Sequence, residues 1–192
     1  MIEKKTYYFE KPGKANTSDC LSIVAAAVVG FGYKHIVVAT TGGETGALFS
    51  EAFKDTGVKL VAVSHSYGFK EPNTIELDPD LASEIRANGA VLYTGTMVTH
   101  SLESAFAKQF NGLYPTLIVA QSLRRFGEGA KVCCEIAMMA VDAGLVPEGV
   151  DVIAVAGTGR GADTVMVIRS AASKRFFDLK VQEILAKPLF GI

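Results

Sequence analysis

The sequence contains no tryptophan and, among its 192 residues, only three cysteines and three histidines. A low and odd cysteine count argues against a disulfide framework and is typical of proteins in a reducing compartment, so we expect a cytoplasmic protein. The histidines and cysteines do not have the spacing of a zinc site, and no metal is predicted. Cys133 and Cys134 stand side by side in an expected helix, without a motif that would indicate a catalytic thiol.

Charge imbalance and long apolar runs are also missing. The chain carries 19 basic and 20 acidic residues, for a net charge of −1, which gives no long-range attraction to nucleic acid or to a membrane surface. The longest apolar stretch, residues 23–29, is far shorter than the ~20 residues of a membrane helix. The first nine residues are polar and aromatic and do not form a signal peptide. We therefore expect neither a nucleic-acid nor a membrane partner.

The residues that are present indicate an α/β domain, with 49% hydrophobic residues and 19 glycines. Short runs rich in β-branched residues predict strands over residues 35–39, 59–64, 90–93, 150–156 and 164–169. Helical spacing and capping residues predict helices between them, over residues 21–29, 47–53, 80–88, 131–143 and from a cap at Thr99 or Ser101 to Phe110. Residues 114–126 fit a strand or a helix, and Pro115 near their start favours a helix.

We expect a single domain over residues 1–192. It has an N-terminal arm (1–14) and a C-terminal extension (173–192) to which the pattern assigns no element. Strands that alternate with helices predict a parallel sheet covered on both faces. Such sheets bind ligands outside the carboxyl ends of their strands. The polar loops that begin at Thr40, His65, Thr94 and Gly157 are therefore expected to meet at one edge.

The loop after the first strand is the strongest candidate for a phosphate site. It leads from residues 35–39 into a helix, whose first N–H groups and dipole attract anions. Its glycines allow a ligand to approach the backbone, its threonines add hydroxyl donors, and its acid is a candidate general base or acceptor for a sugar or ribityl hydroxyl. These residues are Thr40, Thr41, Gly42, Gly43, Glu44, Thr45 and Gly46. The alternative is an ordinary strand–helix turn with Thr45 as N-cap.

The loop after residues 150–156 is the second glycine-rich motif. Gly157, Gly159 and Ala162 match the dinucleotide fingerprint, but a strand rather than a helix follows, so we favour a hairpin with Arg160 at its tip. An arginine there would clamp a phosphate or carboxylate, although a solvated surface arginine fits the same pattern. The candidate ligand contacts are Gly157, Thr158, Gly159, Arg160, Gly161 and Asp163.

Aromatic residues follow the second strand at the same expected edge. Tyr67 and Phe69 would stack on a planar ring and His65 would hydrogen-bond to it, unless these side chains simply pack over the sheet. Thr94, Gly95 and Thr96 follow the third strand and complete the candidate set. A phosphate loop beside an aromatic loop suits a mononucleotide.

The two glycine-rich loops together are similar to those of a known protein family. A threonine–glycine loop after the first strand, with a final hairpin of sequence Ala-Gly-Thr-Gly-Arg-Gly-Ala-Asp-Thr-Val-Met-Val at residues 156–167, resembles the C-terminal domain of pyruvate kinase, and most closely small stand-alone proteins of that fold. The resemblance covers roughly residues 17–172. It implies a three-layer α/β/α sandwich whose five-stranded sheet has the order 3-2-1-4-5, with the last strand antiparallel.

The resemblance also implies a function. In pyruvate kinase this domain holds no catalytic residues and binds a phosphorylated allosteric effector in the loops that match residues 40–46 and 157–161 here. Because the catalytic barrel is not part of this sequence, the resemblance implies that it is not a pyruvate kinase. Glu44, with no lysine or arginine in its loop, departs from the effector site and argues against a sugar bisphosphate.

We therefore expect a protein that binds a phosphorylated small molecule, with flavin mononucleotide (FMN), which is compatible with the stand-alone relatives, as the leading candidate. One alternative is an isomerase, hydrolase or flavin oxidoreductase that acts on a phosphorylated metabolite. The other is a structural or oligomerisation unit without a ligand. The sequence does not decide between them, and it leaves homo-oligomerisation open.

Overall fold

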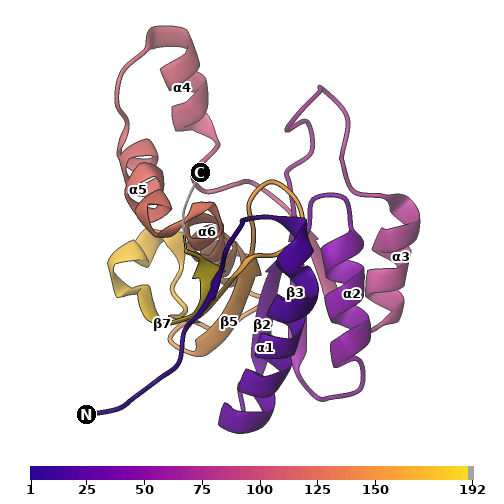
Figure 1. Cartoon of the computed structure of the whole chain (residues 1–192). Coiled ribbons are helices and arrows are strands. Elements are labelled where there is room, and N and C mark those ends of the chain that lie inside the picture. The colour runs from indigo at the N-terminus through magenta and orange to yellow at the C-terminus, as the bar shows by residue number, and fades with distance from the viewer. Residues whose placement is uncertain (190–192) are drawn as a thin grey trace.

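The computed structural model of the chain describes residues 1–189, and it shows one mixed sheet with helices on both faces (Figure 1). The strands are β1 (Tyr7–Phe9), β2 (His35–Ala39), β3 (Lys59–Ser64), β4 (Val91–Thr94), β5 (Asp151–Ala156), β6 (Thr164–Arg169) and β7 (Lys180–Pro188). The α-helices are α1 (Thr17–Phe31), α2 (Glu44–Phe53), α3 (Pro79–Ala87), α4 (Leu102–Phe110), α5 (Pro115–Leu123) and α6 (Glu128–Asp142). Short 3₁₀ segments span Lys14–Asn16, Arg124–Phe126 and Ser173–Asp178.

The sheet of the described residues has seven strands in the order β1-β7-β6-β5-β2-β3-β4, so the expected five-stranded sheet is wrong in size. The five expected strands lie next to one another as β4-β3-β2-β5-β6, and β6 runs antiparallel to β5. Two further strands extend the sheet beyond β6. Strand β7 comes from the C-terminal extension and pairs antiparallel with β6, and β1 comes from the N-terminal arm and pairs parallel with β7. Residues 190–192 of that extension lie outside the described residues.

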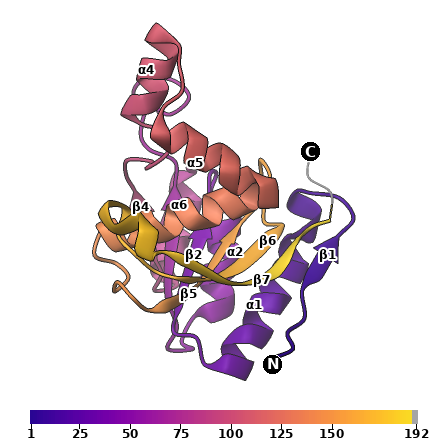
Figure 2. The same ribbon diagram turned by 90° about the vertical axis from the view of Figure 1, so that its left-hand side faces the viewer.

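Both faces of the central strands are buried, as the continuous apolar runs predict. On β2, Ile36 and Val38 pack into a cluster with α1, α2 and α3, while Val37 packs on the opposite face into a cluster with α6. Figure 2 shows α6 and α1 on opposite sides of the sheet. This arrangement brings the loops after β2, β3 and β5 to one edge, between the two helical layers.

The structure decides two local points that the sequence left open or placed differently, the state of residues 114–126 and the start of helix α6. Residues 115–123 form helix α5, with Pro115 in the first turn, where its missing N–H costs no hydrogen bond. Helix α6 begins at Glu128, three residues before the expected start at Lys131. The extra turn matters because it buries Lys131 inside the helix rather than leaving it at an exposed end.

Helix α4 projects from the body of the molecule (Figures 1 and 2). It has no buried residue, and Leu102, Phe106 and Phe110 are all exposed. Ser101, one of the two expected caps, is the N-cap residue, but its side chain makes no capping hydrogen bond and its hydroxyl donates to the Met97 carbonyl. Thr99 lies before the cap, and its hydroxyl donates to Glu135. No helix within residues 1–189 combines the length and the apolar character required to cross a bilayer.

Candidate functional site

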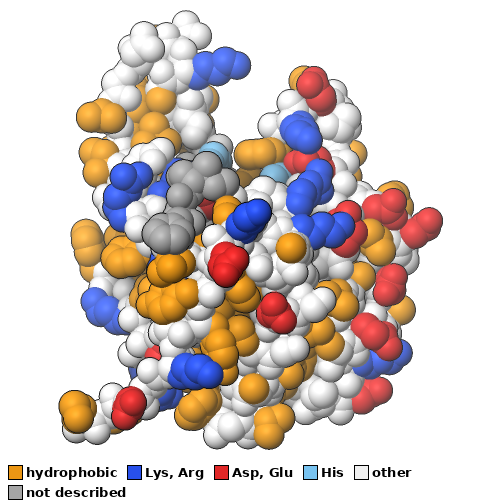
Figure 3. All heavy atoms as spheres, in the orientation of Figure 1, with side chains coloured by type: hydrophobic (Ala, Val, Ile, Leu, Met, Phe, Trp, Pro, Cys, Tyr) orange, Lys and Arg blue, Asp and Glu red, His pale blue; other side chains and the backbone are white. Residues whose placement is uncertain are grey.

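A cavity of about 240 Å³ opens at the edge where the loops after β2, β3 and β5 meet. Figure 3 shows a recess at this side of the molecule, between the α4 projection and the loop that joins β3 to α3. Both glycine-rich loops contribute to its wall. The predicted site residues that line it are Thr40, Thr41, Gly42, Glu44, Thr45, His65, Phe69, Gly157, Gly159, Arg160 and Gly161.

The start of helix α2 forms one end of this cavity. Gly43 is the N-cap, with φ 114°, and no side chain caps the helix, so Thr45 lies within the first turn and is not the N-cap considered from the sequence. The Gly46 N–H donates to the Thr40 hydroxyl at 3.1 Å. The N–H groups of Glu44 and Thr45 have no intrahelical acceptor because of their position in the first turn. They form an amide-rich end suited to an anion.

Two glycines of the phosphate loop face the protein rather than the cavity. A Cβ atom on Gly43 would lie 2.6 Å from Leu81 Cβ, and one on Gly46 would lie 2.8 Å from Ile85 Cδ1. Both neighbours belong to α3, so these glycines allow α2 and α3 to pack closely. Their role in the described structure is helix packing, and it differs from the ligand approach predicted for them.

The remaining predicted residues also lie outside the cavity lining. Tyr67 is 64% exposed. Gly95 packs against the Tyr93 ring, and Thr94 shares a hydrogen bond with Ser64. Asp163 is fully buried and accepts hydrogen bonds from three groups, namely Gly13 N, Thr158 N and the Thr164 hydroxyl. Asp163 therefore ties the hairpin to the N-terminal arm. Thr96 and Thr158 are likewise not among the lining residues.

Arg160 reaches the cavity from the β5–β6 hairpin, with its side chain 51% exposed. Its Nη2 lies 3.6 Å from Glu76 Oε1. Glu76 also accepts from His65 Nδ1 at 2.7 Å and pairs with Lys70 Nζ at 3.1 Å. Burial alone would raise the pKa of Glu76, but the hydrogen bonds from His65 and Lys70 outweigh it and lower that pKa. The Arg160 contact is the longest of the three that Glu76 makes with cationic side chains.

Aromatic rings form a second part of the wall. The His65 and Phe69 ring centroids lie 4.3 Å apart, and those of Phe69 and His100 lie 6.1 Å apart. These three rings connect the loop after β3 with the segment after β4. Their planes are tilted to one another by 47° and 72°, so a planar group can stack on one ring at a time and not on a shared flat surface.

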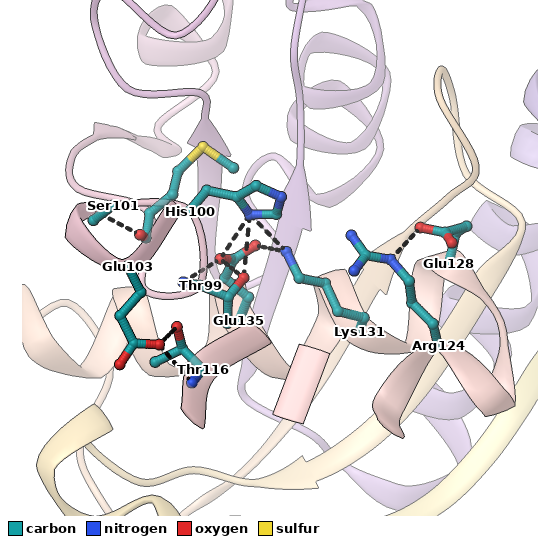
Figure 4. A network of polar contacts seen from close by, with 10 residues as sticks. Thr99, His100, Ser101, Glu103, Thr116, Arg124, Glu128, Lys131 and Glu135 are labelled. Atoms are coloured by element: carbon teal, nitrogen blue, oxygen red, sulfur yellow. Dashed lines mark hydrogen bonds and ion pairs between the residues drawn. The ribbon is translucent and has the colours of Figure 1, made fainter. Parts of the chain in front are cut away.

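Sequence reasoning missed a buried polar network on the α6 side of the cavity (Figure 4). Lys131 Nζ donates to Glu135 Oε2 at 2.5 Å, and both side chains are 2% exposed or less. Glu135 Oε1 accepts from the Thr99 N–H at 2.8 Å and from the Thr99 hydroxyl at 2.5 Å. His100 Nδ1 lies 3.1 Å from Lys131 Nζ. The signal was a Lys–Glu pair four residues apart in an otherwise apolar helix.

The protonation of this network follows from its surroundings. Burial alone would raise the pKa of Glu135, but the ammonium of Lys131 and the hydrogen bonds that Glu135 accepts from Lys131 and Thr99 outweigh it and lower that pKa to about 2. Burial lowers the pKa of Lys131, and the charge of Glu135 opposes the shift. We conclude that Glu135 is an ionised carboxylate and Lys131 its ammonium partner at neutral pH.

The three cysteines are unsuited to nucleophilic chemistry. Cys20, Cys133 and Cys134 are free and buried. Burial raises the pKa of Cys20 and of Cys134 to about 12 and raises that of Cys133 well above its ordinary value, so none of them forms a thiolate readily. Within residues 1–189, no group of three or more His, Cys, Asp and Glu side chains is arranged to hold a metal ion.

Comparison with known proteins supplies the family. The profile of the family described as "Pyruvate kinase, alpha/beta domain" matches residues 18–168, well over half of the chain. Among solved structures, a pyruvate kinase from Cryptosporidium parvum is similar, with 18% sequence identity and a TM-score of 0.43. The match covers 84% of this chain and 24% of that enzyme's chain, so the chain spans only a small part of the enzyme's length. On the strength of the profile match, the chain belongs to the pyruvate kinase α/β domain family.

Proposed function

We propose that this protein binds a phosphate-bearing small molecule in the cavity at the carboxyl edge of its sheet, with the phosphate at the start of α2. The observation that carries the proposal is that the first N–H groups of α2 open into a cavity that Arg160 also lines. Helix N-termini favour anions through their N–H groups and their dipole, and an arginine adds a charge-assisted contact. The other charged side chains do not favour an anion, since apart from Arg160 three acids and two bases line the cavity.

FMN is the ligand that we favour. Its phosphate would lie at the α2 end, and its ring would stack on one ring of the aromatic wall, that of Phe69 or that of His65, since their planes are tilted by 47°. The cavity, at about 240 Å³, is slightly smaller than the roughly 300–1,000 Å³ of typical small-molecule sites. A ligand as large as FMN would therefore leave part of its ring at the open side of the recess, next to the exposed Phe69.

A second candidate is an enzyme that acts on a phosphorylated metabolite, such as an isomerase, a hydrolase or a flavin oxidoreductase. The observation that favours it is the Lys131–Glu135 pair with His100 in the cavity wall, together with Glu44 at the phosphate end. Buried titratable groups in a cavity are typical of active sites. Further proposals are a cytoplasmic location, supported by three free buried cysteines, and self-association, supported by the exposed apolar side chains of α4.

Titration of the Arg160→Ala protein with FMN tests the proposal. A hydrogen bond to a charged group contributes about 1.5–3 kcal/mol, so affinity should fall roughly ten- to a hundredfold. Because Arg160 is half-exposed on a hairpin tip, the melting temperature of the empty protein should not change. Arg160→Lys should recover part of the affinity, since an ammonium cannot make the planar bidentate contact.

Arg125→Ala is the matched control, because Arg125 is an exposed arginine outside the cavity lining. Thr45→Val removes one hydroxyl from the phosphate end without removing a helix cap, and it should also weaken binding. Isothermal titration calorimetry measures both effects, and the visible absorbance of the purified protein shows directly whether it carries a flavin. Equal FMN affinities for the Arg160→Ala and Arg125→Ala proteins would refute the proposed phosphate contact.

A further inference from the structure

The Lys131–Glu135 pair needs an explanation other than stability. Both side chains are almost fully buried, and the cost of removing two charges from water cancels much of the attraction between them. Apolar residues of similar size would fill the same space at less cost. The pair, however, lies in the cavity wall, against the partly exposed His100, whose side chain is 30% exposed.

The contacts of His100 Nδ1 define which ring nitrogen carries the proton. The ammonium of Lys131, at 3.1 Å, is a donor without any acceptor capacity, so Nδ1 must accept from it. The nearest Glu135 oxygen, at 3.7 Å, is too distant for a hydrogen bond from Nδ1. The Thr99 hydroxyl, 3.2 Å from Nδ1, donates its one proton to Glu135 and can only accept from the ring, and the Lys131 ammonium at the same nitrogen decides against that contact. The imidazole is therefore neutral, with its proton on Nε2.

The orientation of the ring leaves the Nε2–H available as a hydrogen-bond donor to a ligand. Figure 4 shows Nδ1 turned toward the network and the other ring nitrogen turned away from it. His100 also lines the cavity and stands 6.1 Å, centroid to centroid, from Phe69 in the aromatic wall. A neutral imidazole held in this way offers one N–H donor to whatever occupies the cavity, and the buried pair prevents it from turning that nitrogen into an acceptor.

We propose that His100 is a ligand-contacting residue whose Nε2–H donates to a carbonyl oxygen of the phosphorylated ligand, and that Lys131 and Glu135 are the positioning residues that hold it in this form. This inference rests on the proposed function, because it adds a second recognition point to the same cavity. Because this ring nitrogen can only donate, the ligand class that matches it best is a phosphate ester whose second polar group only accepts, which is a carbonyl group. The carbonyl has two sources, the ring of FMN or the keto or aldehyde group of a compact phosphorylated metabolite.

Nitrogen-15 NMR of the ligand-free protein tests the positioning half. At neutral pH the His100 signals, assigned by their loss in His100→Phe, should be those of the Nε2–H tautomer. In Lys131→Met the ammonium donor is gone, and the Nδ1–H tautomer should become populated. If that variant does not fold, Lys131→Met/Glu135→Gln leaves no unpaired charge and serves the same purpose. A wild-type His100 in the Nδ1–H form, or protonated on both nitrogens, would overturn the proposal.

Calorimetric titration tests the ligand half with a matched pair of probes. Dihydroxyacetone phosphate and glycerol 3-phosphate differ at one carbon, which is a carbonyl in the first and an alcohol in the second. The wild-type protein should prefer the carbonyl compound, and His100→Phe, which keeps an aromatic wall but no donor, should lose the preference and bind the compound roughly two- to tenfold more weakly. His100→Gln, which returns an N–H donor, should recover part of the affinity.

FMN forms the second arm of the same experiment. A two- to tenfold loss of FMN affinity in His100→Phe supports the flavin as the source of the carbonyl, and the same loss for dihydroxyacetone phosphate supports a compact metabolite. If either probe binds and His100→Phe changes neither affinity, the role of His100 is refuted while the phosphate site stands. If the wild-type protein binds neither probe nor inorganic phosphate, the proposed function itself fails, and the ligand half of this inference fails with it.

Discussion

Removal of one member of the Lys131–Glu135 pair should destabilise the protein far more than removal of both. Lys131→Met leaves the Glu135 carboxylate buried without its cation, and such a loss typically costs about 3–5 kcal/mol. Glu135→Gln leaves the ammonium unpaired in the same way. In the double variant, the amide oxygen that replaces the carboxylate can still accept from Thr99, and no buried charge remains. We expect its free energy of unfolding to lie within about 1 kcal/mol of the wild-type value.

Urea unfolding followed by circular dichroism at pH 7 measures these differences as shifts of the midpoint at constant slope. For a chain of this size, about 3–5 kcal/mol corresponds to a fall in melting temperature of roughly 6–20 °C. Arg124 and Glu128 supply a matched control, because they form another pair four residues apart, at 2.8 Å, with side chains 20% and 45% exposed. Arg124→Met and Glu128→Gln should each cost less than about 1 kcal/mol.

The double-mutant cycle decides the interpretation, since it isolates the coupling between the two side chains. Large losses in both single variants, with recovery in the double variant, indicate a desolvated pair. If Lys131→Met costs no more than Arg124→Met, the pair is solvated, and the reasoning about its burial is refuted. A double variant as unstable as the single ones would show instead that each side chain is needed for its packing.

Two further predictions concern the stability of glycine variants in the α-helices and the stability of the protein at low pH. Gly30→Ala in α1 should stabilise the protein by about 0.5–1 kcal/mol, because an added Cβ meets open space, whereas Gly129→Ala in α6 should destabilise it, because that Cβ would lie 2.2 Å from the Thr164 hydroxyl oxygen; urea midpoints that move in the same direction would contradict this. Glu135, with its pKa lowered from an ordinary 4.5 to about 2, contributes stability that is complete above pH 4.5 and is lost as the pH falls through about 2. As the pH falls from 4.5 to about 2, the wild type should therefore lose free energy of unfolding relative to Lys131→Met/Glu135→Gln. A difference between the two proteins that does not change with pH in this range would contradict the lowered pKa.

The sequence predicts most of the central fold because its signals are local. The five strands from 35–39 to 164–169 are apolar runs that need no knowledge of their partners, and all five form. Strand β7 was missed because its first residues are exposed and mixed in polarity, so alternation is weak. Strand β1 has only three residues, and its partner is distant in the sequence, so nothing local marks it as a strand.

The candidate site, too, was predicted where its signals are local and missed where they are not. The loops after β2 and β5 were expected to meet because the carboxyl ends of neighbouring parallel strands share an edge, and both loops line one cavity. The network around Glu135 could not be found from local pattern. Thr99 and His100 come from an irregular segment, and only the fold brings them against α6, 36 residues away from Thr99. Lys131, read as the polar start of a helix, was buried by one additional helical turn.

The pairing of β1 with β7 has a consequence for how the molecule forms as it is synthesised. Tyr7 pairs with Ala186, so β1 has a sheet partner that lies far along the chain and leaves the ribosome much later. Until β7 emerges, β6 also lacks the neighbour on its outer side. An unpaired strand edge can bind other chains, and contacts so distant in sequence form slowly. Strand β1 is thus placed only after β7 has been made, and the outer edge of β6 stays open during the interval between the synthesis of β6 and that of β7.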